Sequence, residues 1–125
     1  MYEDVKIVKE YKGAAKTFVE NVVARVTETE KDKIGILEFM KLYKDECGTT
    51  VVQICGGNNG RSDWEQYFKS LIEIAKEFKR VFGRMWLIEL YNDCSDDVWY
   101  AKFGIEFDAD KFENDDVHLE HLMIE

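Results

Sequence analysis

The residues with the clearest potential for chemistry are two histidines near the end of the sequence. His118 and His121 lie three positions apart, a spacing that can hold a metal ion. A third ligand could come from Asp115, Asp116 or Glu120. No further ligand pattern surrounds these residues, so two exposed histidines are the simpler interpretation. We predict no metal site and no cofactor.

Two clusters of aspartates, at 93–97 and 108–110, are the next candidates. Neither cluster has the regular Asp spacing, Gly and twelfth-position Glu of a calcium-binding loop. A carboxylate pair for glycosidic chemistry depends on a separation in space that the sequence does not display. No spacing places a nucleophile beside a base. We therefore predict that the protein is not an enzyme, and an enzyme that uses residues 118–121 or a carboxylate pair is kept as a competing hypothesis.

A glycine-rich segment, 56–64, precedes the most regular apolar pattern in the chain. Helix N-termini can bind phosphate, but the segment lacks both the P-loop signature and the spacing of a dinucleotide fingerprint. Asp63 also places a carboxylate where a phosphate would lie. A structural turn is the better interpretation. Ser62 then caps the following helix together with Glu65, and Gly83 ends that helix.

The helix after this turn is predicted by apolar residues at three- and four-residue steps. They are Trp64, Tyr67, Phe68, Leu71, Ile72, Ala75, Phe78 and Phe82. Before it, residues 5–11 predict a strand, and 14 to about 30 a helix with one apolar face. Residues 34–55 predict a hairpin around a turn at 44–48. Residues 34–43 also fit a helix, in which case the first helix continues to about residue 45.

After the central helix, two strands are predicted on either side of a polar turn. Residues 85–91 are apolar on both faces near their start, which suits a middle position in a sheet. Residues 98–107 alternate cleanly and therefore have one buried face. That face consists of Trp99, Ala101, Phe103, Ile105 and Phe107. Residues 108–116 are interpreted as a loop, and 117–124 as a short edge strand or a packed tail.

The tryptophans are expected mostly in the core. Trp86 and Tyr100 fall on sheet faces whose exposure the pattern does not fix, and if exposed they would be interface anchors.

The order of these elements is β-α-β-β-α-β-β, which predicts a single α+β domain over residues 1–125. We expect an antiparallel or mixed sheet of about five strands with two helices packed on one face, a variant of the ferredoxin-like order. A chain of 125 residues that is 46% hydrophobic can supply one core.

The sequence has no long apolar run and no signal-peptide pattern at its acidic start, so we expect a cytoplasmic protein that does not bind membranes. Its three widely spaced cysteines, Cys47, Cys55 and Cys94, are expected to be reduced and mostly packed.

Charge is divided unevenly along the chain. Residues 1–62 hold ten basic and ten acidic residues, whereas 63–125 hold seven basic and sixteen acidic ones, which accounts for the whole net charge of −9. An acidic field of this kind repels nucleic acid and attracts a basic partner. An acidic tail that only improves solubility is an equally good interpretation of composition alone.

Two segments resemble a known family. They are 54–64, ICGGNNGRSDW, and 83–93, GRMWLIELYND. With the helix between them, they are similar to the seventh immunity-protein family of bacterial polymorphic toxin systems, over about residues 50–107. Asn59, Arg61 and Trp64 fit the family's turn motif, and we assign them, with Ser62 and Gly83, to the fold. Gly60 stands where the family usually has His, and the family's proline-rich end is missing.

The resemblance implies neutralisation of a secreted toxin, such as one delivered by contact-dependent growth inhibition. The charge distribution agrees, because a nuclease toxin is basic where it binds phosphates. We expect a monomer or weak dimer that occludes a basic toxin domain without catalysis. The expected toxin-binding acids are Asp93, Asp96, Asp97, Asp108, Asp110, Glu113, Asp115 and Asp116, with Trp99 or Tyr100 as anchor. A ferredoxin-like module that binds a small molecule is the alternative.

Overall fold

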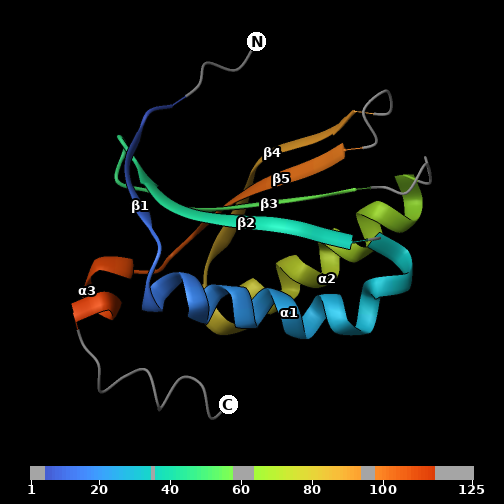
Figure 1. Cartoon of the computed structure of the whole chain (residues 1–125), viewed down its shortest axis with the longest axis horizontal. Helices are drawn as coiled ribbons and strands as arrows, with labels where there is room; N and C mark the ends of the chain where they lie inside the picture. Colours follow the sequence, from blue (N-terminus) through green and yellow to red (C-terminus); the bar gives the residue numbers. More distant parts are fainter. Residues whose placement is uncertain (1–4, 35, 58–63, 94–97, 115–125) are drawn as a thin grey trace.

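The computed structural model describes the backbone of residues 5–34, 36–57, 64–93 and 98–114, and the side chains of 5–26, 40–55, 71–91 and 100–114. Within these ranges the chain forms a five-stranded sheet and three helices (Figure 1). The elements are β1 (Ile7–Tyr11), α1 (Ala14–Ile34), β2 (Ile36–Asp45), β3 (Thr50–Gly57), α2 (Trp64–Phe82), β4 (Met85–Asp93), β5 (Val98–Ile105) and α3 (Ala109–Asn114). None of the described helices is long and apolar enough to cross a membrane.

The sheet has the strand order β1-β2-β3-β5-β4, and all four pairings are antiparallel. The predicted α+β class with an antiparallel sheet is therefore confirmed. In a split β-α-β unit another strand lies between the two strands that flank the helix. The second half of the chain fits this pattern, because α2 connects β3 to β4 and β5 lies between these two strands in the sheet. The first half does not, because α1 connects β1 to β2 and these two strands pair directly. The ferredoxin-like pairing is not confirmed.

Both long helices lie on the same side of the sheet in Figure 1. The predicted apolar face of α1 is buried, and it packs in one core with α2 and with the helix-facing residues of the strands. On α2 the buried positions include Leu71, Ile74 and Phe78, whereas Ile72 is exposed. The predicted stripe was wrong at this position because Ile72 lies about 100° around the helix from Leu71.

The predicted 34–55 hairpin is confirmed as β2 and β3, and the alternative of a first helix continuing to residue 45 is wrong. At the turn, Asp45 Oδ1 accepts hydrogen bonds from the backbone N–H groups of Cys47 and Thr49, at 2.9 and 3.0 Å. Gly48 has a φ of 84°, a conformation that glycine adopts without a steric penalty. Gly83 ends α2 as predicted, with a φ of 83° and an N–H that donates to the carbonyl of Lys79 at 2.9 Å.

Two predictions for the second half of the chain are wrong. Residues 85–91 were expected in the middle of the sheet, but β4 is at the edge of the described sheet, where β5 is its one pairing partner among the described strands. Residues 108–116 were expected to form a loop, but Ala109–Asn114 form α3. This short helix packs Phe112 against Phe18 and Phe107, with ring centroids 5.1 and 5.4 Å apart. It therefore covers the end of the core that α1 and α2 leave open.

Candidate functional site

Three of the acids that were predicted to bind a toxin lie on or beside α3, and each has a contact within the chain. Asp108 caps the helix, because its Oδ1 accepts the backbone N–H of Lys111 at 3.0 Å. Asp110 bridges Lys9 of β1, at 2.7 Å, and Lys44 of β2. Glu113 lies against Gly13, where an added β carbon would come within 3.0 Å of its Oε2. These contacts hold α3 to the sheet edge and to the start of α1.

Asp110, Lys9 and Lys44 form an ion-pair network, and the pKa shifts of all three residues reflect it. Hydrogen bonds from Lys44 and then Lys9 hold the pKa of Asp110 far below its usual range. The same bonds raise the pKa of both lysines. Beside them, burial raises the pKa of Tyr11, and the nearby Asp110 carboxylate adds to that rise. Much of the negative charge of Asp110 is thus already balanced from within the chain.

A second group of polar and aromatic residues joins β4 and β5 on the side of the sheet away from the core. Tyr100 was expected as an anchor, and it stacks on Tyr91 with ring centroids 5.0 Å apart and planes inclined by 26°. Its hydroxyl donates to Glu89 Oε1 at 3.1 Å, and Lys102 Nζ lies 3.3 Å from Glu89 Oε2. The backbone register places Glu89 beside Lys102 and Tyr91 beside Tyr100. The result is a fixed aromatic pair next to a compensated carboxylate.

At the other end of β4, Trp86 lies over Gly104 of β5. A β carbon at Gly104 would be 2.2 Å from Trp86 Cε2, so the close approach of the indole requires glycine at this position. Arg84 lies over the indole ring at 5.7 Å from its centroid, within the range of a cation–π contact. Trp86 is 39% exposed, and the sequence pattern alone had not fixed its exposure.

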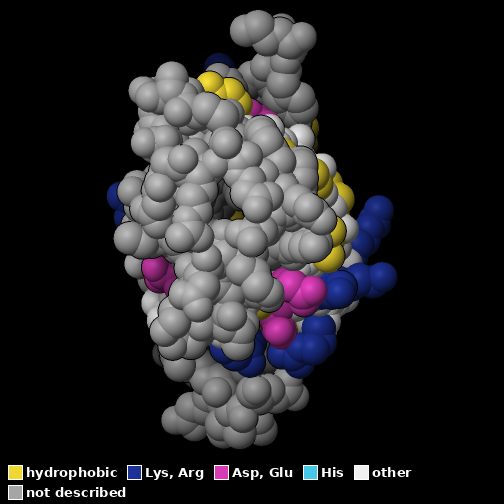
Figure 2. Space-filling view, turned by 90° about the vertical axis from the view of Figure 1, so that its right-hand side faces the viewer, with side chains coloured by type: hydrophobic (Ala, Val, Ile, Leu, Met, Phe, Trp, Pro, Cys, Tyr) yellow, Lys and Arg dark blue, Asp and Glu magenta, His cyan; other side chains and the backbone are white. Residues whose placement is uncertain are grey.

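The largest described apolar side chains that remain exposed are concentrated on the two edges of the sheet. Trp86, Leu87 and Tyr91 lie on β4, Ile7 and Val8 lie on β1, and only Ile72 lies elsewhere, on α2. Exposed apolar groups gathered on an element, unlike scattered ones, indicate an interaction surface. Figure 2 shows hydrophobic side chains in a strip along the margin of one end of the molecule, next to a group of Lys, Arg, Asp and Glu side chains. The sequence did not predict that apolar side chains would be exposed on β1 and β4, because the position of a strand at the sheet edge depends on strand order.

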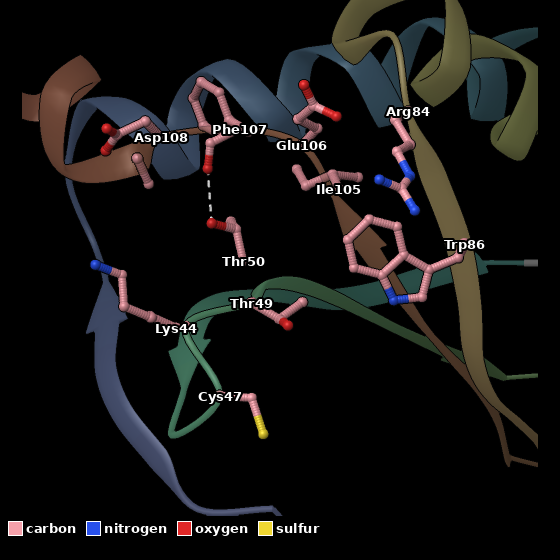
Figure 3. Close-up of a pocket in the computed structure, with 12 residues that line it drawn as sticks. Lys44, Cys47, Thr49, Thr50, Arg84, Trp86, Ile105, Glu106, Phe107 and Asp108 are labelled. Carbon is pink, nitrogen blue, oxygen red and sulfur yellow. Dashed lines mark hydrogen bonds between the residues drawn. The ribbon is translucent and has the colours of Figure 1, made fainter.

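A pocket of 450 Å³ opens at one end of the sheet, between the β2–β3 turn and the residues that precede α3. Figure 3 shows Trp86 and Arg84 on one side of it, Glu106 and Asp108 on another, and Lys44 and Cys47 on the turn side. Thr50 closes its inner wall by donating a hydrogen bond to the carbonyl of Phe107 at 2.6 Å. The lining is mixed in charge, which suits a small polar molecule with both signs of charge.

The described residues offer no group of three His, Cys, Asp or Glu that could hold a metal ion. Cys47 is exposed at the turn and Cys55 is half-buried, so Cys47 departs from the expectation of mostly packed cysteines. The strand backbone includes Asp93 and Trp99, and Trp64 begins α2, but their side chains lie outside the described set. The remaining predicted residues lie outside the described residues altogether. These are Asn59, Arg61, Ser62, Cys94, Asp96, Asp97, Asp115, Asp116, His118 and His121.

Comparisons of the chain with protein-family models, with curated proteins and with solved structures find no match. A function must therefore be inferred from the residues and their geometry.

Proposed function

We propose that the protein is an immunity protein that binds and neutralises a cognate secreted bacterial toxin, without catalysis, in the cytoplasm of the cell that makes it. The toxin domain is basic, as expected of a nuclease that binds phosphates. The protein blocks it by occupying or flanking the basic groove. The similarity of segments 54–64 and 83–93 to the seventh immunity-protein family supports this proposal.

The observation that carries the proposal is the confinement of the whole net charge of −9 to residues 63–125. Complementary charge accelerates the encounter of two proteins and discriminates against partners of the wrong sign. In this proposal Asp110 contributes less than the other acids, because its ion pairs with Lys9 and Lys44 already balance much of its charge. Asp96 and Asp97 lie in the sequence between Tyr91 and Tyr100, the two residues of the stacked pair, and they carry the attraction in this proposal.

The test uses the C-terminal domain of the protein encoded directly upstream, inactivated by substitution, as the binding partner. We expect one-to-one binding whose association slows as salt rises. The double variant Asp96→Lys/Asp97→Lys should associate about tenfold more slowly at low salt. The matched control is Glu10→Lys/Glu20→Lys, which changes two exposed acids in the neutral half and alters the net charge equally. Equal slowing in both variants would show that only net charge matters, and no slowing in either would remove the electrostatic mechanism.

The pocket beside Trp86 favours a second candidate, a module that binds a small molecule. Such a ligand would raise the melting temperature saturably, because it binds only the folded chain. A metabolite screen by thermal shift tests this function. A hit whose effect disappears in Arg84→Ala would place the ligand in this pocket and favour the second candidate over the first.

A further inference from the structure

The two edges of the sheet are built differently. β1 is five residues long, and lysines at positions 6, 9 and 12 lie within it or directly beside it. Short length and lysines are the usual protection of a sheet edge against pairing with another chain. β4 is nine residues long and contains neither lysine nor proline. By these criteria the outer edge of β4 is unprotected.

The side chains of β4 add to this difference. Trp86, Leu87 and Tyr91 are 39%, 54% and 44% exposed, although each is large and apolar. An exposed strand edge with apolar side chains is the feature that strand-adding complexes use, because its free backbone groups supply hydrogen bonds and its side chains supply contacts. In the described residues β4 has a pairing partner on one side only, β5.

The register of β4 limits where an added strand can pair. Ile88 forms an irregularity between the pairs Leu87–Phe103 and Glu89–Lys102, so the ladder is interrupted there. From Glu89 to Asp93 the pairing with β5 is continuous. A regular run of five residues, 89–93, is therefore the segment whose outer backbone groups can accept another strand in register.

Charge identifies the kind of strand that fits. The only charged residues of β4, Glu89 and Asp93, are both acidic and lie in this run. Lys102 of β5 already pairs with Glu89, so a complementary strand carries lysine or arginine opposite Asp93 and apolar residues opposite Leu87 and Tyr91. A second copy of β4 does not meet this condition, because antiparallel self-pairing of the run 89–93 would place Glu89 opposite Asp93 of the other copy. Like charges opposite each other destabilise a strand pair.

We propose that the outer edge of β4 is the docking site for an extended, cationic segment of the toxin, which adds to the sheet as a sixth strand. This inference rests on the proposed function and specifies its contact surface. The backbone of residues 89–93 supplies the hydrogen bonds. Leu87 and Tyr91 supply apolar contacts, and the stacked Tyr91–Tyr100 pair offers a ring face to an arginine of the toxin.

The test measures binding of the inactivated upstream-encoded toxin domain to the variant Leu87→Lys/Tyr91→Lys. Added lysines repel a cationic strand and remove its apolar contacts, so we expect at least about tenfold weaker binding, mostly through faster dissociation. Two single variants are controls that each add one lysine at an exposed apolar position, Ile72→Lys on α2 and Val8→Lys on β1, where the replaced side chains are 52% and 64% exposed. Both should bind within about twofold of the wild type.

A backbone measurement separates strand addition from side-chain contact alone. Amide hydrogen exchange in residues 89–93 should slow in the complex, whereas exchange in β1 should not change. Unchanged exchange in 89–93, or equal weakening by the control variants, overturns the docking site while leaving the proposed function intact. A wild-type chain that fails to bind the toxin domain overturns both. The wild-type chain could instead self-associate through β4 of one copy and β1 of another. If it self-associates and both Leu87→Lys/Tyr91→Lys and Val8→Lys abolish this, the β4 edge binds a second copy and the inference is overturned.

Discussion

Replacing Phe112 by alanine tests whether α3 is a structural element or a dispensable surface helix. Phe112 is only 6% exposed and packs between the rings of Phe18 and Phe107. Removing a buried phenylalanine side chain costs about 3–5 kcal/mol. The cost is capped here, because a six-residue helix can undock while the sheet, α1 and α2 stay folded. After the substitution, among the described residues, α3 is held mainly by buried Ala109 and by the surface ion pairs of Asp110, and pairs of this kind contribute little to stability.

We therefore expect Phe112→Ala to lower the free energy of unfolding by about 3 kcal/mol, at the low end of the range for core phenylalanines. With a urea dependence of about 1.5 kcal/mol per molar, the unfolding midpoint falls by about 2 M. Tryptophan fluorescence of the three tryptophans monitors the transition. Phe112→Leu keeps the apolar contact and should cost less than about 1.5 kcal/mol. A loss below about 1 kcal/mol for Phe112→Ala would show that α3 does not close the core.

Two further predictions concern the clusters on either side of the sheet. The folded chain depresses the pKa of Asp110, so the stabilisation from this carboxylate is present above its unfolded pKa of about 3.9 and is lost as pH falls through the folded value. The pKa values of Lys9 and Lys44 are raised in the folded chain, so the stabilisation from these lysines is present below their unfolded pKa of about 10.4. It is lost as pH rises through their folded pKa values. Asp110→Asn should therefore make stability less dependent on pH at both the acidic and the basic end, as measured by urea unfolding midpoints across pH. Added salt should reduce the difference in stability between Asp110→Asn and the wild type, because the ion pairs are in contact with solvent. Gly104→Ala should cost about 1–3 kcal/mol and shift the tryptophan emission, because the added methyl group would displace the Trp86 indole; unchanged emission and stability would contradict the close approach.

Local patterns in the sequence predicted the elements that repeat regularly. The apolar face of α1 and the alternation of β5 are each visible within one segment, and Gly83 marks the end of α2 by itself. α3 was missed because six residues contain too few turns to display a helical period, and its only start signal is Asp108. The edge position of β4 was missed for another reason. Burial on both faces of residues 85–91 was inferred from composition, whereas strand order depends on pairings between distant segments.

The candidate site shows the same limit for charge. The sequence gives the number of acids in residues 63–125, but it does not say which of them have partners. Asp110 pairs with Lys9 across 101 positions and with Lys44 across 66. Neither spacing carries a recognisable signal, so all the acids of this region had to be treated alike. The structure identifies Asp108, Asp110 and Glu113 as acids that have contacts within the chain, whereas Asp96 and Asp97 lie outside the described residues.

The two parts of the proposed interface make different contributions to binding, and kinetics can separate them. The charges of Asp96 and Asp97 act at a distance, so in this proposal they change the association rate and its dependence on salt. The edge of β4 acts only after contact, through backbone hydrogen bonds and the burial of Leu87 and Tyr91, so it changes the dissociation rate. If the Asp96/Asp97 variant altered only dissociation, those acids would belong to the contact itself. If the Leu87/Tyr91 variant altered only association, added positive charge would explain its effect, and the edge of β4 would have no role in the complex.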